Sequence, residues 1–329
     1  MGKTTSSKKI LKLITIVLVA IFVVTGVLLG LEMWDLHRGK FNGENQGDKP
    51  VIYNGVEYEL NKNIQTFLVL GLDKFEGASS TDSYNNDKQS DFLMLFIFDD
   101  SAKKWSVMNI NRDTMVEMNI LGVAGDKVGT VTKQIALAHT YGNGRNVSCQ
   151  NTADAVSNLL NGVRVNHYIS LTMDSVSVLN DLVGGVEVTV LDDFTGIDDK
   201  LIKGQNVTLK GAQALTYVRT RYGLEDSTNS TRMERQKQYL DGLYEKIVSS
   251  SEKDEEFIVN ASLKMTDYII SDRSVTQLQE LGKKCIEYTK GDIITLAGES
   301  KMGEKYVEFY PDSAALEKLV IDLFYLPKS

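Results

Sequence analysis

The amino-acid sequence predicts an α/β fold, in which a central mixed β-sheet is layered between α-helices and is preceded by one transmembrane helix. Three observations lead to this prediction. One apolar stretch near the N-terminus is long enough to span a bilayer, short apolar runs recur along the rest of the chain, and helical patterns lie between those runs. Strands that alternate with helices favour a sheet whose faces are covered by helices.

The N-terminal stretch, Leu13 to Leu31, contains no ionisable side chain over 19 residues. About 20 apolar residues in a helix cross the hydrocarbon core of a bilayer. A cleaved signal peptide is the alternative, but the stretch is longer than a usual signal core and no clear small-residue cleavage site follows it. We therefore expect residues 1–12 to be a basic cytoplasmic tail, residues 13–34 a single-pass anchor in the cell membrane, and the C-terminal portion extracytoplasmic.

Residues 35–62 are predicted to be a juxtamembrane linker and lead-in, because Arg38 to Pro50 carries hardly any apolar side chains. The short apolar runs that predict buried strands are Phe67 to Leu72, Phe92 to Phe98, Val107 to Ile110, His167 to Leu171 and Val186 to Val190. Apolar residues at spacings of three and four predict helices over Thr132 to Tyr141, Thr152 to Leu160, Met173 to Leu182 and Arg232 to about Ser250.

Loops and glycines separate these elements. The segment from Gly77 to Lys88 is polar and is expected to form a loop between the first two strands, where binding sites commonly lie. Gly184 and Gly185 are expected to permit a tight turn before the strand at Val186.

Charge limits the kinds of ligand. The chain has 36 Lys and Arg against 44 Asp and Glu, a net charge of −8. The portion after the basic tail is more acidic still, which argues against nucleic acid as a partner and requires any anion site to be local. The two cysteines, Cys149 and Cys285, either form one disulfide or are small buried side chains, and the sequence leaves both alternatives open.

Arginines cluster in three short motifs, and they are Arg112, Arg219, Arg221, Arg232 and Arg235. Guanidinium groups present a fixed fork of donors that matches phosphate oxygens, so the clustering favours recognition of phosphate or pyrophosphate. Arg232 and Arg235 are three residues apart and are expected to share a helix face. The alternative for each arginine is a solvated ion pair with the many carboxylates of this acidic chain.

Two carboxylates, Asp73 and Asp91, lie at ends of predicted strands. Mg²⁺ takes one or two carboxylates together with phosphate oxygens, so this pair is a candidate metal site beside the arginines. The alternative is that each aspartate forms a turn or a helix cap. Because the histidines and cysteines lack zinc-ligand spacing, zinc is not expected.

In order, these motifs resemble the LytR-CpsA-Psr (LCP) family of bacterial envelope proteins. The matching segments are Phe67 to Asp73, Ser90 to Leu95, Asn111 to Thr114, Lys133 to Gly142, Asp181 to Val186, Leu209 to Arg221 and Arg232 to Gln236. The resemblance implies that residues 63–250 are the catalytic domain. Residues 251–329 carry no clustered arginines and no acid pair of their own, so they are expected to be a supporting region. The resemblance also implies a Gram-positive type of bacterium.

The reaction that the resemblance implies is phosphoryl transfer. A glycopolymer such as a teichoic acid or capsular polysaccharide would move from a polyprenyl-pyrophosphate carrier, which is a membrane lipid, to a sugar hydroxyl of peptidoglycan. By similarity, the pyrophosphate would be bound by Arg112, Arg219, Arg221, Arg232, Arg235 and Gln236, and Mg²⁺ or Mn²⁺ would be held by Asp73 and Asp91. Asp91 is also a candidate base for the attacking hydroxyl, a use that competes with metal binding.

This chain departs from the family pattern at two positions. Gln89 stands where arginine is common, and Asn111 stands where proline is common. Two other functions remain open at this stage: a non-catalytic envelope protein that binds polymer or lipid, and a pyrophosphatase that uses water in place of the sugar hydroxyl.

Overall fold

The computed structural model describes residues 49–73, 88–221, 223–224 and 229–328. The predicted cytoplasmic tail, the predicted anchor over residues 13–34 and nearly all of the predicted polar loop from Gly77 lie outside the described residues. Within the part that is described, no helix has the length and apolar character needed to cross a membrane.

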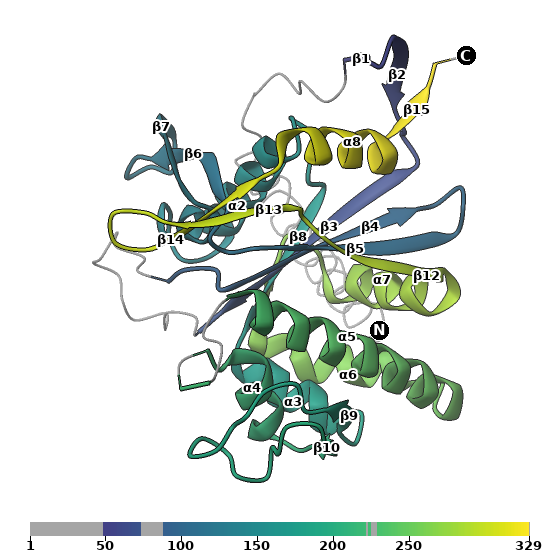
Figure 1. Ribbon diagram of the computed structural model, residues 1–329. Coiled ribbons are helices and arrows are strands. Elements are labelled where there is room, and N and C mark those ends of the chain that lie inside the picture. The colour runs from purple at the N-terminus through teal and green to yellow at the C-terminus, as the bar shows by residue number, and fades with distance from the viewer. Residues whose placement is uncertain (1–48, 74–87, 222, 225–228, 329) are drawn as a thin grey trace, which may run out of the picture. The chain divides into compact units, whose positions relative to one another are not determined.

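A six-stranded mixed sheet lies at the centre of the described portion, in the order β11-β8-β3-β4-β5-β12 (Figure 1). Strands β3, β4 and β5 form an antiparallel meander, whereas β8 pairs parallel with β3 and β12 pairs parallel with β5. The prediction of a central mixed sheet is therefore confirmed. The strands are β3 (Ile64–Leu72), β4 (Phe92–Asp99), β5 (Lys104–Ile110), β8 (His167–Thr172), β11 (Ile269–Ser271) and β12 (Thr289–Thr295).

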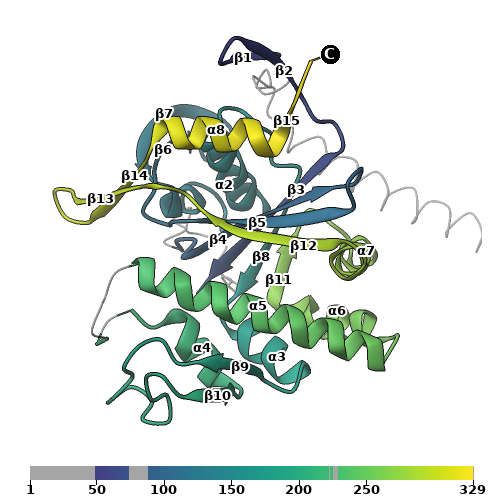
Figure 2. The same cartoon turned by 45° about the vertical axis from the view of Figure 1, so that its right-hand side comes forward.

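Helices cover both faces of this sheet (Figures 1 and 2). Helices α2 and α8 lie on one side, and α5, α6 and α7 lie on the other. This layered arrangement follows from the alternation of strand side chains, which gives the sheet two apolar faces that both need covering. The helices are α2 (Asn146–Leu159), α5 (Asn229–Lys253), α6 (Phe257–Met265), α7 (Val275–Glu287) and α8 (Ser313–Phe324).

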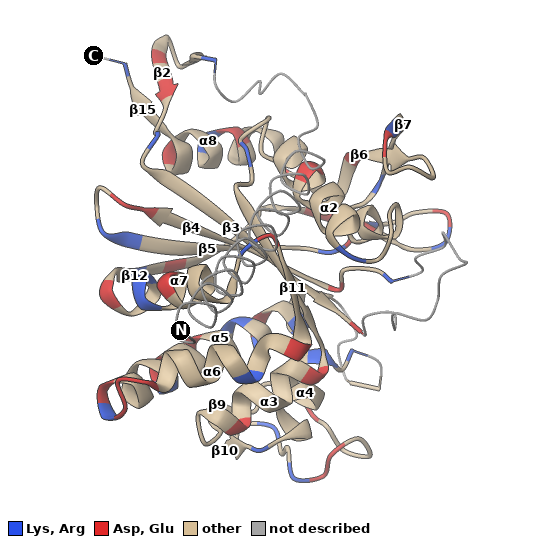
Figure 3. Cartoon of the chain, turned by 180° about the vertical axis from the view of Figure 1, so that it is seen from behind, with Lys and Arg blue, Asp and Glu red and all other residues tan. Residues whose placement is uncertain are grey.

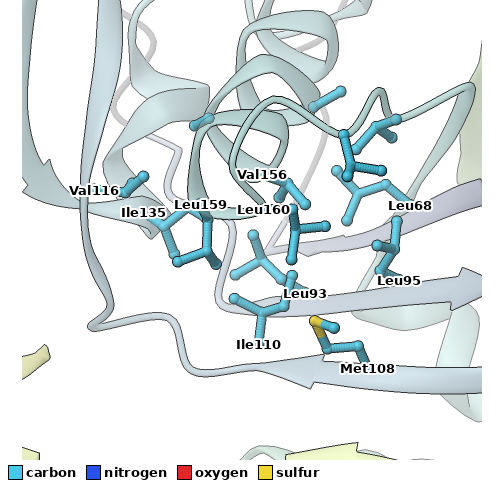
Figure 4. Close-up of a cluster of buried hydrophobic side chains, with 14 of the residues drawn as sticks. Leu68, Leu93, Leu95, Met108, Ile110, Val116, Ile135, Val156, Leu159 and Leu160 are labelled. Atoms are coloured by element: carbon cyan, nitrogen blue, oxygen red, sulfur yellow. The ribbon is translucent and has the colours of Figure 1, made fainter. Parts of the chain in front are cut away.

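The larger core lies on the α2 and α8 face. Leu68 of β3, Leu95 of β4 and Met108 of β5 point to this face, and each is fully or almost fully buried. Figure 4 shows them meeting Val156 and Leu160 at the end of α2. Apolar burial of this kind is the main contribution to the stability of the sheet.

The opposite face of the sheet is aromatic. Phe96 of β4 stacks on Trp105 of β5 with ring centroids 5.7 Å apart, and Trp105 makes an edge contact with Tyr244 of α5 at 5.3 Å. The indole N–H of Trp105 donates to the carbonyl of Cys285 in α7 at 3.0 Å. Phe96 and Tyr244 are only partly buried, so this face keeps accessible apolar surface near the helices.

A separate apolar cluster packs below α5, where a hairpin of two short strands meets two helices (Figure 1). The predicted strand at Val186 is found here and not in the central sheet, because it pairs only with β10. Gly185 has φ +99, and a Cβ would lie 2.6 Å from the carbonyl of Leu209, so the predicted glycine turn is confirmed. These elements are α3 (Asp174–Leu182), β9 (Val186–Thr189), β10 (Asn206–Leu209) and α4 (Ala212–Arg219).

The C-terminal region is part of the same body as the central sheet. Strands β11 and β12, both beyond residue 250, form the two edges of the six-stranded sheet. A boundary at residue 250 therefore does not separate two cores. Smaller pieces complete the fold: β1 (Val51–Tyr53) and β2 (Val56–Leu60) with β15 (Tyr325–Pro327), the hairpin β6 (Met115–Leu121) and β7 (Lys127–Gln134), and the hairpin β13 (Gly298–Met302) and β14 (Val307–Pro311).

The helix predicted over Thr132 to Tyr141 is wrong. Its first residues belong to β7, and only the 3-10 helix η2 (Ile135–Thr140) follows. Backbone bonds explain the difference, because Ile135 N–H donates to Thr114 O and Ala136 N–H donates to Arg112 O. Tertiary pairing with the segment after β5 thus replaces the bonds that a longer helix would need.

The two cysteines form no disulfide; both are free. Cys149 lies in the core on the α2 face, whereas Cys285 packs on the aromatic face, so the sheet lies between them. Of the two alternatives that the sequence left open, the structure shows the second, in which each cysteine is a small side chain packed among largely apolar neighbours. Burial raises the pKa of both thiols to about 12.

Because of His139, we expect the folded protein to lose stability at acidic pH. The ring is fully buried, and burial lowers its pKa from 6.5 to about 4. The pKa of His139 is lower in the folded protein than in the unfolded chain, so the folded state is favoured while the ring is neutral and loses this advantage as the pH falls. We therefore expect the free energy of unfolding to decrease by roughly 3 kcal/mol between pH 6.5 and 4. Urea denaturation across this range should show a shallower pH dependence for His139→Phe than for wild type; equal slopes would contradict the prediction.

Candidate functional site

An ion pair marks the end of the central meander. Leu93 of β4 and Ile110 of β5 are the last facing pair of that ladder, and Asp91 and Arg112 lie two residues beyond them. Arg112 Nη1 is 2.7 Å from Asp91 Oδ1, and the side chains are 13% and 26% exposed. Strands β4 and β5 thus place one carboxylate and one arginine side by side at one end of the sheet, beyond the ends of these two central strands.

Asp113 is a second carboxylate at this end of the sheet and is 5% exposed. Its Oδ1 accepts a hydrogen bond from Gln134 Nε2 at 3.1 Å and lies 3.8 Å from Arg112 Nε. Burial raises the pKa of Asp113, while the nearby charges of Arg112, Arg221 and Arg232 oppose that rise. The charges of three arginines therefore act on one buried carboxyl group.

Arg232 reaches the same place from the first turns of α5. It is 6% exposed, and its Nη2 donates to the carbonyl of Asp91 at 3.2 Å and to Asn229 Oδ1. Burial lowers the pKa of Arg232 to about 10, so the guanidinium stays charged at neutral pH. Arg221, just after α4, also acts electrostatically on Arg232.

Two arginine donors in this group have no acceptor. The Nε atoms of Arg112 and Arg232 are buried and make no hydrogen bond within the described part of the chain. Buried polar groups are nearly always hydrogen-bonded, so an unsatisfied pair of guanidinium donors suggests that a ligand completes them. Oxygens of a phosphate or pyrophosphate match these donors in charge and geometry.

A pair of asparagines joins the two chain segments that carry these arginines. Asn229 Nδ2 donates to Asn111 Oδ1 at 2.6 Å, and the same oxygen accepts from the backbone N–H of Asp113 at 2.9 Å. Asn229 Oδ1 accepts from Arg232. The relay fixes the start of α5 against the segment after β5, and it uses the position where the family commonly has proline.

We expect Asn111 and Asn229 to be energetically coupled. In a double-mutant cycle of Asn111→Ala and Asn229→Ala, the coupling should be about 1 kcal/mol, because each single change leaves a buried partner unsatisfied. Urea unfolding of the four proteins measures it. Asn158→Ala, which removes a hydrogen bond from α2 to the carbonyl of Glu117 on β6, serves as the distant control and should be additive with Asn111→Ala. Additivity of the Asn111 and Asn229 pair would exclude the relay.

Gln89, the other departure from the family pattern, contacts Arg112 directly. Its Oε1 accepts a hydrogen bond from Arg112 Nη2. An arginine at this position would repel Arg112 unless an anion lay between them, whereas the glutamine amide holds Arg112 without a ligand. The substitution thus replaces a cation with a neutral acceptor beside the cluster.

Arg219 forms a separate ion pair. It is the last residue of α4, and its Nη2 is 2.7 Å from Asp73 Oδ1 just after β3. The two side chains are 51% and 47% exposed, so this contact contributes little to stability and can open at low cost. Arg219 and Asp73 lie at ends of elements next to the cluster, but neither contacts it in any bond found within the described residues.

The structure separates Arg235 from the other arginines. Arg235 is 0% exposed; its Nε is 3.1 Å from Asp192 Oδ2, and its guanidinium lies 5.3 Å from the ring of Phe194. Its Nη2 donates to the carbonyl of Thr220. The expectation that Arg232 and Arg235 share a face is therefore corrected: one turns to Asp91, and the other turns into the core below α5.

Gln236 also makes a structural contact, since its Nε2 donates to the carbonyl of Val218 at 3.2 Å. Of the predicted residues, the structure thus gathers Asp91, Arg112, Arg221 and Arg232. It adds Asp113, Gln134 and Asn229, which sequence reasoning did not select as site residues. Asp113 and Gln134 had a signal, because each lies inside one of the family-like motifs; Asn229 had none.

A divalent cation would find suitable oxygens here. Asp91 Oδ1 is buried and makes no hydrogen bond within the described residues, its contact being the ion pair with Arg112. Asp91 N–H donates to Gly71 O at 3.0 Å, so Asp91 lies opposite the end of β3. Asp73 is the first residue after that strand. Among the described residues, no group of three or more His, Cys, Asp or Glu gathers that could hold a metal ion.

Comparison with known proteins gives consistent results. The model of the LytR_cpsA_psr family matches residues 37–321. A protein of Enterococcus faecalis named polyisoprenyl-teichoic acid–peptidoglycan teichoic acid transferase TagU is 31% identical over 192 residues, 57% of this chain and 55% of that protein. The chain thus spans about half the length of that curated relative.

Solved structures share the fold. TagV of B. subtilis aligns with a TM-score of 0.60 at 24% identity and covers 80% of this chain and 97% of that one. A structure described as TagT bound to LI-WTA aligns with a TM-score of 0.60 at 21% identity, over 84% of this chain and 96% of that one.

Proposed function

The chain belongs to the LytR_cpsA_psr family, and from that premise we propose that it is a cell-wall glycopolymer transferase. In the proposed reaction a teichoic acid or similar anionic polymer moves from a polyprenyl-pyrophosphate carrier to a sugar hydroxyl of peptidoglycan. The observation that carries the proposal is the cluster of Arg112, Arg221 and Arg232 with two buried, unsatisfied Nε donors. The name of the Enterococcus faecalis relative supports the choice of polymer.

The arginines supply what phosphoryl transfer needs. The acceptor hydroxyl attacks the phosphorus that carries the glycan, the bond from that phosphorus to the bridging oxygen breaks, and polyprenyl phosphate leaves. Charge then spreads over the phosphoryl oxygens, and guanidinium groups already fixed in a partly buried place stabilise it. Arg219 can join after it leaves Asp73, because that ion pair is half exposed. Asp91 is a candidate to take the proton of the hydroxyl.

The aromatic face of the sheet suits the lipid of the carrier. Phe96, Tyr244 and their neighbours leave accessible apolar surface between the strands and α5. The strands that present this surface end at the arginine cluster, so a prenyl chain on it would bring its pyrophosphate toward Arg112. An N-terminal anchor in the cell membrane, with the catalytic portion extracytoplasmic, would keep the protein beside this lipid.

Charge supports a local anion site rather than a general one. In Figure 3 the middle of the central sheet is tan, and blue and red segments lie on helices, strand ends and loops. The protein as a whole is acidic, with a net charge of −8. Binding of the anionic donor is therefore proposed to depend on the arginine cluster and on the apolar contact with lipid, and not on long-range attraction.

We also propose that Asp73 and Asp91 hold Mg²⁺, which would neutralise pyrophosphate charge when bound. Transfer should then be lost in EDTA and be restored by excess Mg²⁺ or Mn²⁺. Asp91→Asn should raise the Mg²⁺ concentration needed for half-maximal rate by about tenfold or more, since a ligand of the ion loses its charge. The exposed carboxylate variant Asp267→Asn is the control. Unchanged activity in EDTA would reject the metal site.

One experiment separates the proposed function from its alternatives. The full-length protein in detergent is incubated with a short polyprenyl-pyrophosphate glycan and peptidoglycan oligomers, and products are analysed by mass spectrometry. A phosphodiester-linked glycan supports the transferase. Release of glycan phosphate without ligation would instead identify a pyrophosphatase, and intact substrates would favour a non-catalytic polymer-binding protein.

A further inference from the structure

The hairpin of β13 and β14 carries an unusual amount of exposed apolar surface. Met302 is 76% exposed, Tyr306 69%, Val307 41% and Tyr310 42%. Every residue of β13 is exposed. Figures 1 and 2 show the hairpin extending past α8 and β6, with its turn at the edge of the described portion. Exposed apolar patches on a folded domain commonly mark binding surfaces.

The hairpin is attached directly to the arginine cluster. Phe309 N–H donates to Asp113 O at 2.8 Å, and Phe309 forms a parallel bridge with Thr114. Gln134 Nε2 donates both to Asp113 Oδ1 at 3.1 Å and to Val307 O at 2.7 Å. Because the bridge between Thr114 and Phe309 is parallel, Arg112, two residues before Thr114, lies level with Val307, two residues before Phe309. The turn of the hairpin therefore lies beyond the level of Arg112.

The two faces of the hairpin differ. Phe309, the partner of Ser300, is buried, so the face of β14 that carries Phe309 packs on the core while Ser300 stays exposed; Met302 and Val307 continue this face beyond them. Lys301 pairs with Glu308 and Glu299 pairs with Tyr310 on the opposite face. Strand alternation places Tyr306 on that opposite face too, since Gly303 N–H donates to Tyr306 O and continues the ladder. We call the face of Tyr306, Tyr310, Glu308, Lys301 and Glu299 the outer face.

On the basis of the proposed function, we propose that the outer face binds the saccharide chain of the acceptor. A sugar ring has an apolar C–H face that packs on a flat aromatic ring, and it has hydroxyls at its edge that need polar partners. The outer face offers two exposed tyrosine rings with Glu308 between them. Tyr310 O–H already donates to Glu308 Oε2 at 2.6 Å, which holds that carboxylate beside the ring, and Lys301 Nζ lies 5.7 Å from the ring centroid.

Two features favour the acceptor over the donor as the occupant. The reaction needs a second substrate whose hydroxyl reaches the arginine cluster, and the hairpin joins an exposed surface to that cluster. Glu299 and Glu308 outnumber Lys301 on the outer face, and Lys301 is paired with Glu299 at 3.0 Å, so the face has a net negative charge that disfavours an anionic polymer of the donor. The tyrosines are four residues apart, about 13 Å along a strand, which is long enough to contact more than one ring of a chain.

The test uses the full-length protein and four variants. Binding of a soluble β-1,4-linked N-acetylglucosamine oligomer is measured by calorimetry without donor, for wild type, Tyr306→Ala, Tyr310→Ala and Tyr310→Trp. Met302→Ser is the matched control, because Met302 is exposed on the same hairpin but on its other face. Each alanine variant should weaken binding roughly tenfold, and Tyr310→Trp should keep it, because a ring remains for the sugar.

The transfer assay provides the second readout. The alanine variants should raise KM for the acceptor and leave KM for the donor unchanged. A wild-type protein that does not bind the oligomer, equal binding by all variants, or an effect on donor KM alone would each overturn the inference. Weakened oligomer binding by the alanine variants in a protein that transfers no polymer would support the surface while rejecting the transferase, so the two failures can be told apart.

Discussion

Arg112→Ala is expected to lower kcat/KM for polymer transfer by about 10²–10³-fold, the loss seen when one fixed donor to a developing oxyanion is removed. Arg112 is the residue that links the cluster together. Its guanidinium contacts Asp91 at 2.7 Å, lies 3.8 Å from Asp113 and donates to Gln89, while its Nε stays unsatisfied. The alanine would remove a charge that is proposed to face the phosphoryl group and that its contacts already orient in the free protein.

The same substitution leaves the carboxylate of Asp91 without its ion-pair partner, so loss of fold must be distinguished from loss of chemistry. Arg112→Lys keeps the positive charge but not the planar fork, and it should retain the fold while transfer falls by at least about tenfold. Arg164→Ala, which removes an exposed arginine just before β8, is the control and should transfer polymer normally. Steady-state kinetics on variants with wild-type circular dichroism measure the effect. Wild-type transfer by Arg112→Ala would sink the catalytic assignment.

Arg235→Ala is expected to destabilise the protein by roughly 3–5 kcal/mol, because it leaves the buried charge of Asp192 unpaired. Arg235 is completely enclosed and lies between Asp192 and the rings of Phe194 and Tyr217. Burial lowers the pKa of Arg235, and Asp192 opposes that shift. The free energy of unfolding in urea, measured for wild type and variant, gives the size of the loss.

A double replacement makes the interpretation specific. Arg235→Met combined with Asp192→Leu removes both charges and keeps apolar volume, so it should recover most of the stability that Arg235→Ala loses. The transfer rate per folded molecule should then remain close to wild type. If Arg235→Ala kept full stability but weakened donor binding, Arg235 would belong to the pyrophosphate site after all, as the family-like motif first indicated.

Local patterns predicted much of the fold. Continuous apolar runs at Phe67, Phe92 and Val107 identified strands β3, β4 and β5, because a strand covered on both faces needs apolar side chains at every position. The run at Val186 instead alternates valine with Glu187 and Thr189, so only one face of the strand is buried, and the strand pairs only with β10. The helix predicted over Thr132 to Tyr141 failed because its backbone is bonded to a distant segment.

The site was predicted in part. The sequence selected Arg112, Arg232 and Asp91 by residue type and by family resemblance, and the structure brings them together. Asn229 could not have been selected, since an isolated polar residue has no pattern of its own, whereas Gln134 lies inside a family-like motif that did not single it out. Their roles arise from contacts with Asn111 and Asp113, which are 118 and 21 residues away in the chain.

The sequence by itself determined most of the strands and helices, the arginine-rich motifs and the family, because each depends on residues that are neighbours along the chain. Only the tertiary structure decided which arginines share a site. Arg232 and Arg235 are one turn apart on α5, yet one meets Asp91 at the end of the sheet and the other is buried against Asp192. The two arginines are only three residues apart in sequence, but they extend from α5 in different directions. The groups that each arginine contacts come from distant segments of the chain, and only tertiary packing brings those segments to α5.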